Sequence, residues 1–482
     1  MAIRPFKRVA VTAATALSMT TLLATTAQAV PATLPHESMV TYTISPDGKV
    51  VAKADVKVNA RAKDTVAPIT LSGDADGVVV AAGKKTKPAN YKILRAQPGY
   101  NPYQHPAPHG EDPDSEDLDL KQGFTADQLL TLYQSDIPEN ISYTNVISGI
   151  NEALKHPEVS QKNAALVLSI NNNATPAQIQ RALEDSNEEN LSTMSDALGT
   201  HLGKIYYDLY KDGKLVKLQQ LVGGNMSRGF NFTNATLIEK VSYNLKRPFY
   251  TFPQNVKYYY EDEDDFLEDD GYKGLALSYP SGHTNRAYIK GIILAAVFPE
   301  FAPQIMARAS EVGYNRVVMG VHYPLDTIAG RMTGTASMAW HFADSKFYPL
   351  IAETAKETRA IIEKACGTTI MKCWAQGSPF LSEAESIRVY TERMNFGFPR
   401  IGTNKNAPMV IPATANYLLR AKYPNLTAAQ RDRILLLSAM SAGYPLDITG
   451  KDGYWQRINL AKALSARVTV AQGGAMKVSF PA

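Results

Sequence analysis

The sequence predicts a mostly helical protein with a small β-containing region near its N-terminus. Beyond about residue 125, apolar side chains recur every three or four residues, which is the period of a helix with one buried face. Between Val40 and Val58 they alternate instead, and Pro46-Asp47-Gly48 supplies a turn, a pattern typical of a β-hairpin. The chain has 482 residues, 45% of them hydrophobic, which is enough for a large core.

The first 29 residues read as an export signal. A basic start is followed by an apolar run from Val9 to Thr26 and by the small-residue cleavage pattern Ala27-Gln28-Ala29. Cleavage there would remove three cationic side chains and no acidic ones, which lowers the formal net charge from +4 to +1. We therefore expect a bacterial protein that is periplasmic or secreted, without a nucleic-acid partner and without a transmembrane segment in the mature chain.

The rest of the chain divides into three regions by pattern. Residues 30–120 are expected to hold the hairpin, a further strand at Val78–Ala81 and an irregular linker. Residues 121–400 are expected to form the helical core, and residues 401–482 a C-terminal helical extension. After Thr175, one helix is predicted to begin at Pro176. Further helices are predicted over residues 287–297, 326–342, 347–365, 381–394 and 427–442. A short strand is expected in the last ten residues.

The chain contains two cysteines, Cys366 and Cys373. In an oxidising compartment a close, even pair predicts a small-loop disulfide, the alternative being two buried thiols. Two cysteines without a neighbouring histidine make a poor metal site.

Three short segments together supply the parts of a phosphate site. They are Lys240-x(6)-Arg247-Pro248, Pro280-Ser281-Gly282-His283, and Asn315-Arg316-x(5)-His322-x(3)-Asp326. Three cations, a turn with free N–H groups, two imidazoles and a carboxylate are what phosphoryl transfer needs when it uses no metal. Taken singly, each segment is equally typical of a salt bridge, a proline turn or a helix cap.

The spacing within the segments suggests how their side chains are placed. Lys240 lies two helical turns before Arg247, so both could share one helix face, and Pro248 would end that helix. Ser281 and Gly282 stand where a turn feeds a helix, and helix N-termini bind anions. Asp326 follows His322 by four residues, so it could orient that imidazole.

The set resembles the type 2 phosphatidic acid phosphatase superfamily over about residues 240–331. The stretch from Ser278 to Thr284 is most similar to the soluble bacterial class A acid phosphatases. Two positions depart from the pattern: Leu277 stands where that class usually has Gly, and Asn315 where the superfamily usually has Ser.

The resemblance implies a helical-bundle core and a role for each motif residue. His322 would be the nucleophile that forms a phosphohistidine, His283 the acid that protonates the leaving oxygen, and Asp326 the group that orients His322. The remaining motif residues would bind the phosphate of a small phosphomonoester without a metal or another cofactor: Lys240, Arg247, Ser281, Gly282 and Arg316.

Other functions stay open at this stage. Vanadium-dependent haloperoxidases share the site, with vanadate as cofactor in the phosphate position, and lipid-phosphate phosphatases share the chemistry. A binding protein that works through its terminal regions is the third alternative. The acidic stretch Glu261–Asp270 is most typical of a solvated loop, the alternatives being a lid, a cation site or a filter against polyanions. The sequence leaves the substrate and the oligomeric state open.

Overall fold

The computed structural model describes residues 39–56, 123–135, 143–187, 190–223, 236–257, 259, 277–402 and 405–481. These residues all belong to one compact unit, His36–Ala482. The expected signal segment, the strand at Val78–Ala81, most of the linker and the acidic stretch lie outside the described residues.

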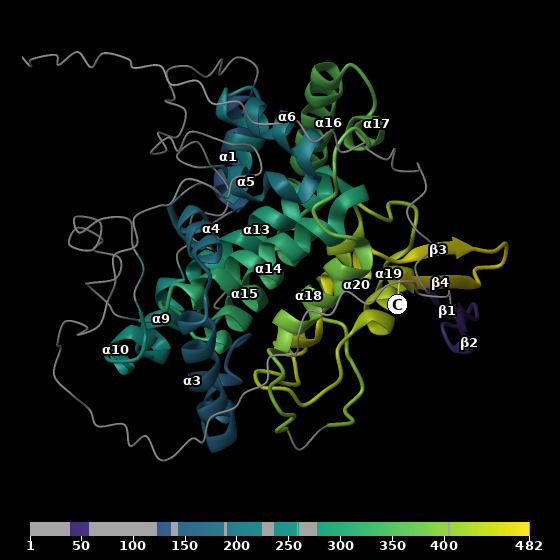
Figure 1. The fold of residues 1–482 in the computed structure, drawn as a ribbon. Coiled ribbons are helices and arrows are strands. Elements are labelled where there is room, and N and C mark those ends of the chain that lie inside the picture. The colour runs from purple at the N-terminus through teal and green to yellow at the C-terminus, as the bar shows by residue number, and fades with distance from the viewer. Residues whose placement is uncertain are drawn as a thin grey trace, which may run out of the picture. The chain divides into compact units, whose positions relative to one another are not determined.

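The described part of the chain is mostly helical, as the sequence predicts (Figure 1). Its α-helices are α1 (Ala126–Ser135), α2 (Ile150–Ala153), α3 (Pro157–Asn172), α4 (Pro176–Asn187), α5 (Asn190–Thr193), α6 (Thr200–Lys211), α7 (Val216–Val222), α9 (Leu237–Tyr243), α10 (Pro248–Thr251), α13 (Gly282–Val297), α14 (Ala302–Val318), α15 (Pro324–Ala343), α16 (Phe347–Cys366), α17 (Ile370–Trp374), α18 (Glu383–Asn395), α19 (Ala428–Ser438) and α20 (Leu460–Leu464). Short 3-10 helices are η2 (Met194–Leu198), η4 (Pro299–Phe301), η5 (Ala415–Leu419) and η6 (Trp455–Arg457).

Helices α13, α14 and α15 pack against one another and form the centre of the core (Figure 1). Small residues let these helices approach closely. A Cβ on Gly330 of α15 would lie 2.5 Å from the carbonyl oxygen of Ser281, and one on Gly291 of α13 would lie 2.9 Å from Ala309 Cβ of α14. The start of α13 is thereby held against α15, which matters for the site below.

The expected helices are present, with boundaries set by their caps. Helix α13 begins at Gly282 rather than at residue 287, because the Ser281 side chain caps it. Helix α15 begins with Pro324 at its first position, and α19 begins after the capping residue Thr427.

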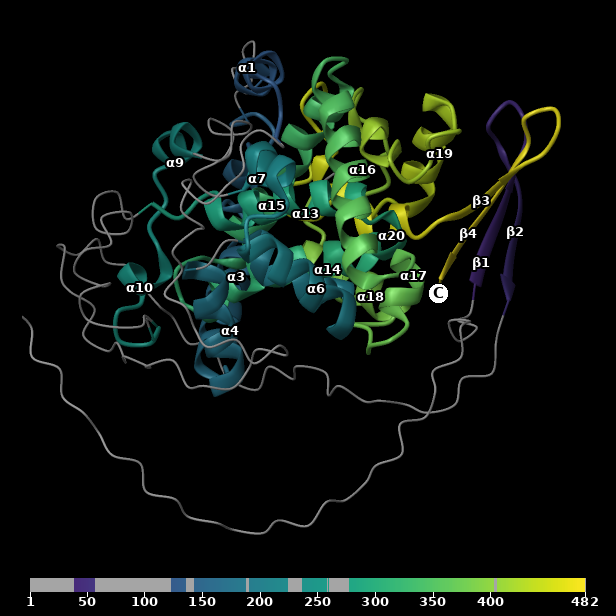
Figure 2. The same ribbon diagram turned by 90° about the horizontal axis from the view of Figure 1, so that it is seen from above.

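The two ends of the described chain meet in one antiparallel sheet with the order β2-β1-β4-β3 (Figure 2). Its strands are β1 (Met39–Ile44), β2 (Val50–Val56), β3 (Arg467–Val470) and β4 (Met476–Pro481). The β1–β2 hairpin and the terminal strand were expected, but their pairing was not: Tyr42 lies opposite Val478 in the register of β1 and β4. Val478 and Phe480 alternate inward and join the core.

Cys366 and Cys373 form the disulfide that the sequence predicts, at the end of α16 and within α17. Among the described residues, no single helix is long and apolar enough to cross a bilayer, and only the sharply bent pair Gly282–Val297 and Pro299–Val318 passes by length and composition.

Candidate active site

The turn that leads into α13 presents a helix N-terminus to the site. The Tyr279–Pro280 peptide bond is cis, and Ser281 follows as the cap of the helix. Ser281 Oγ accepts hydrogen bonds from the Thr284 amide at 3.3 Å and from the Thr284 hydroxyl at 2.8 Å. A hydroxyl that accepts twice still has its own proton to donate, so Ser281 can cap the helix and also bind an anion.

Lys240 reaches the same turn from α9. Its Nζ donates to the carbonyl oxygens of Leu277, Ser278 and Pro280 at 3.1, 3.3 and 2.7 Å. The ammonium group therefore lies beside the start of α13 and also fixes the backbone that precedes it.

The expectation that Lys240 and Arg247 share one helix face is wrong, although the structure brings them together. Helix α9 ends at Tyr243, because Asn244 adopts a left-handed conformation at its C-terminus. Pro248 begins α10 instead of ending a helix, and Arg247 is the residue just before it. The cations meet because the chain turns between them, and burial together with the positive charge of Arg247 lowers the pKa of Lys240.

Arg247 is buried against the segment that carries the expected nucleophile. Its Nη1 donates to the carbonyl oxygen of Val321 at 2.9 Å and lies 3.1 Å from Nε2 of His322. A guanidinium can only donate, so this contact requires an unprotonated Nε2.

The other ring nitrogen of His322 faces Asp326. Nδ1 lies 3.3 Å from Oδ2 of Asp326, and the same oxygen accepts the amide proton of Tyr323 at 2.8 Å. The proton of the neutral imidazole is thus on Nδ1, and the Nε2 lone pair points at Arg247. Asp326 therefore caps the start of α15 and faces the His322 ring with the same side chain.

Arg316 lies in the last turn of α14 and is fully buried. Its Nη1 donates to Sδ of Met319 at 3.2 Å. Its carbonyl oxygen accepts from the amides of Val321 and His322, both at 3.3 Å. The backbone of Arg316, an expected phosphate-binding residue, therefore holds the backbone of His322, the expected nucleophile.

His283 lies in the first turn of α13 beside a cation that the motifs do not include. Nη2 of Arg286 lies 3.3 Å from Nδ1 of His283, so this nitrogen is unprotonated in the neutral ring. Arg286 follows His283 by three residues, which on a helix is enough to predict the contact, and sequence reasoning missed it. The backbone of Ser186 lies close to the His283 imidazole and favours its protonated form.

A second residue outside the motifs, Thr236, lies beside Gly282. A Cβ at Gly282 would come within 3.1 Å of the Thr236 hydroxyl oxygen, so glycine keeps this approach to the helix N-terminus open. Nothing in the sequence singles out Thr236, because its place depends on how α9 packs.

These residues form a cationic cluster, by which we mean Lys240, Arg247, His283, Arg316, His322 and Asp326. Burial and neighbouring charges shift the pKa values of its lysine, its two histidines and its aspartate. Burial lowers the pKa of His322 and His283 well below the usual range, and the nearby arginines lower it further. Burial also lowers the pKa of Lys240 and raises that of Asp326, while attraction between the two favours their charged forms. Both imidazoles are thus neutral in the empty site.

Metal ligands do not gather among the described residues, where no group of three or more His, Cys, Asp or Glu side chains is placed to hold an ion. The site is instead built from cations, imidazoles and backbone N–H groups. This arrangement can bind a tetrahedral anion and present one neutral imidazole nitrogen to it.

Part of the chain matches a known protein family. Residues 226–347, which contain the whole cationic cluster, match the PAP2 superfamily. These residues therefore form a PAP2 superfamily domain.

Two curated relatives show what this part of the chain is similar to. A non-specific acid phosphatase of Salmonella typhi is 34% identical over 105 residues, which are 22% of this chain and 39% of the relative. An acid phosphatase of Zymomonas mobilis is 32% identical over 108 residues, which are 22% of this chain and 38% of the relative. The chain spans about two fifths of the length of these relatives.

Proposed function

We propose that the protein is an exported acid phosphatase that hydrolyses phosphomonoesters through a phosphohistidine, without a metal. The observation that carries this proposal is the orientation of the His322 ring: its Nδ1 faces Asp326 and its Nε2 lone pair faces Arg247. A bound phosphate would take the place of the imidazole as the hydrogen-bond partner of the Arg247 guanidinium. The acid phosphatase names of the relatives support the same chemistry.

In the first step, Nε2 of His322 attacks phosphorus and the ester P–O bond breaks. Protonated His283 gives its proton to the leaving oxygen, which departs as an alcohol. Arg247, Arg316 and the N–H groups at the start of α13 meet the equatorial oxygens, where charge accumulates in the transition state, and the Lys240 ammonium adds positive charge beside them.

In the second step, water attacks phosphorus and the P–N bond breaks. Neutral His283 takes a proton from the water, and phosphate leaves with both histidines restored. Because burial and the nearby cations lower the pKa of His283, its acid role favours low pH, whereas a bound phosphate dianion raises that pKa.

The direct test is an activity screen with and without EDTA, over several phosphomonoesters and over bromide with peroxide and vanadate. We expect phosphatase turnover that EDTA leaves unchanged and that is fastest at acid pH. Turnover that chelation abolishes and a divalent ion restores would contradict the proposal. Fast bromide oxidation by vanadate-loaded protein, with poor turnover of every phosphomonoester, would instead identify a haloperoxidase.

A further inference from the structure

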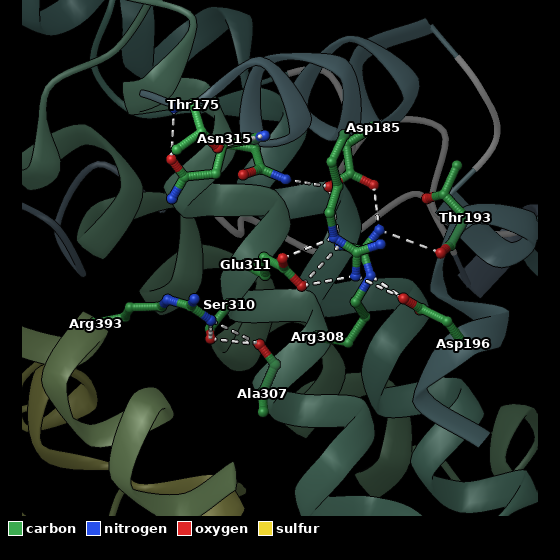
Figure 3. A network of polar contacts seen from close by, with 12 residues as sticks. Thr175, Asp185, Thr193, Asp196, Ala307, Arg308, Ser310, Glu311, Asn315 and Arg393 are labelled. Carbon is green, nitrogen blue, oxygen red and sulfur yellow. Dashed lines mark hydrogen bonds and ion pairs between the residues drawn. The ribbon is translucent and has the colours of Figure 1, made fainter. Parts of the chain in front are cut away.

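A second group of charged side chains, largely buried, joins α4 and η2 to the part of α14 that precedes Arg316 (Figure 3). We call it the Arg308 network: Arg181, Asp185, Asp196, Arg308 and Glu311. Arg308 donates to both oxygens of Asp185 at 2.9 and 2.6 Å and to Asp196 at 3.0 Å. Arg181 donates to Glu311 at 2.7 Å and to Asp196 at 2.6 Å.

Asn315 joins this network to the cationic cluster. Its Nδ2 donates to Oδ2 of Asp185 at 2.7 Å, as Figure 3 shows. Asp185, from α4, is fully buried, and Arg308 and Asn315 are two helical turns apart on one face of α14. Asp185 therefore holds α14 at two points, and the second point is next to Arg316.

The last turn of α14 carries two parts of the site. Besides the Arg316 side chain, its backbone binds the amides of Val321 and His322 through the Arg316 carbonyl. From α3, Asn171 Nδ2 donates to the Val318 carbonyl at 2.7 Å. A small rotation of this turn would therefore move the phosphate ligand and the nucleophile together.

The residue after Asp185 contacts the other half of the site. The backbone of Ser186 lies close to the His283 imidazole and favours its protonated form. One end of α4 thus lies beside His283 and is connected to Arg316 through Asn315.

We propose that Asp185 is a positioning residue of the active site, which acts through Asn315 to set the place of Arg316 and His322. Its test by phosphatase kinetics rests on the proposed function, whereas its test by anion affinity does not depend on the reaction. It also gives a role to Asn315, which stands where the superfamily usually has Ser.

The test compares two Asn315 variants with a control in the same network. Asn315→Ser removes the hydrogen bond to Asp185 without adding volume, and we expect kcat/KM to fall roughly 10- to 100-fold and vanadate to bind correspondingly more weakly. Arg181→Met breaks the ion pairs to Asp196 and Glu311 but leaves the Asn315 contact, so its melting temperature should fall while kcat/KM and the vanadate Kd stay at the wild-type values.

Asn315→Asp supplies a signature that a purely structural role would not produce. Two carboxyl groups at this distance can share a proton at low pH but repel each other when both ionise. The ratio of variant to wild-type vanadate affinity should therefore be close to one at the acid end and decrease as the pH rises.

The outcomes of these experiments distinguish a failure of the positioning role from a failure of the proposed phosphatase function. If wild type turns over no phosphomonoester but Asn315→Ser still weakens vanadate binding, the positioning role stands and the phosphatase does not. Equal kinetics and vanadate affinity in wild type and Asn315→Ser would overturn the positioning role, as would an Asn315→Asp ratio that does not change with pH. A wild-type protein that binds neither vanadate nor phosphate would overturn both.

Discussion

The Arg308 network and the cationic cluster share helix α14 and differ in how their buried charges are balanced. In the network, two guanidiniums face three carboxylates. In the cluster, Lys240, Arg247 and Arg316 share one carboxylate, that of Asp326, which is bonded to the Tyr323 amide and faces His322.

The pKa shifts reflect this difference. Burial works against the charges of Arg308 and Glu311, yet attraction within the network raises the pKa of Arg308 and lowers that of Glu311 to about 2. In the cluster, burial and neighbouring cations act in the same direction and lower the pKa of Lys240 and His322. Network charges stabilise one another, whereas the cluster as defined holds three cations and the single carboxylate of Asp326.

This contrast separates a structural ion-pair network from a binding site. Buried charges that are paired and hydrogen-bonded hold a fold in one arrangement, and removing one partner is costly. Buried cations in excess lower the stability of the protein without a bound anion, and binding of an anion offsets this loss of stability. The following variants address each half of the comparison.

Removing the nucleophile should have the largest effect. His322→Ala should lower phosphomonoesterase activity by at least about 10⁴-fold and abolish acid-quenched labelling by a radioactive substrate, because no other group then attacks phosphorus. His283→Ala is the matched control: with an activated aryl phosphate, whose leaving group hardly needs a proton, it should still form phosphoenzyme. Equal labelling of wild type and His322→Ala would show that the assignment is wrong.

Breaking an ion pair in the Arg308 network should lower the free energy of unfolding. Arg308→Met leaves the buried carboxylate of Asp185 without its guanidinium, and we expect the free energy of unfolding to fall by about 3–5 kcal/mol. Denaturant titration measures this loss. Arg316→Met, which removes a cation from the crowded cluster, should change the stability of the ligand-free protein by less than about 1 kcal/mol; a larger loss there than at Arg308 would reverse the comparison.

Neutralising Arg286 should have a smaller effect, on the pH profile. The charge of Arg286 lowers the pKa of His283, which acts as an acid only below its pKa. Arg286→Gln should therefore raise this pKa and let phosphatase activity persist to higher pH. The matched control is Arg388→Gln on the exposed face of α18, which should leave the profile of kcat against pH in place. A shift of the Arg286→Gln profile toward lower pH would contradict the contact that the structure shows.

The sequence was informative where chemistry is local. The hairpin turn, the turn at Ser281 and Gly282 that leads into α13, and the Cys366–Cys373 pair each depend on neighbours in the chain, and each was predicted. The motif spacing also predicted which residues form the cluster, although the expected continuous helix through Arg247 was wrong because Asn244 interrupts it.

The sequence was uninformative where contacts join distant helices. The pairing of β1 with β4 and the Asp185–Asn315 contact link segments 130 or more residues apart, and no local pattern specifies such partners. For the same reason Asn315 had no role in the sequence and acquires one only from the packing of α4 on α14.

Thermal or denaturant unfolding with and without vanadate tests most directly whether the unbalanced cluster is an anion site. At 100 times its Kd, vanadate should raise the free energy of unfolding of wild type by about 2.7 kcal/mol. The same vanadate concentration should give the same gain in Arg181→Met, whose cluster is intact, and little or none in Arg316→Met. No gain in wild type, or an equal gain in Arg316→Met, would contradict the claim that these buried cations are arranged to bind a phosphate-like anion.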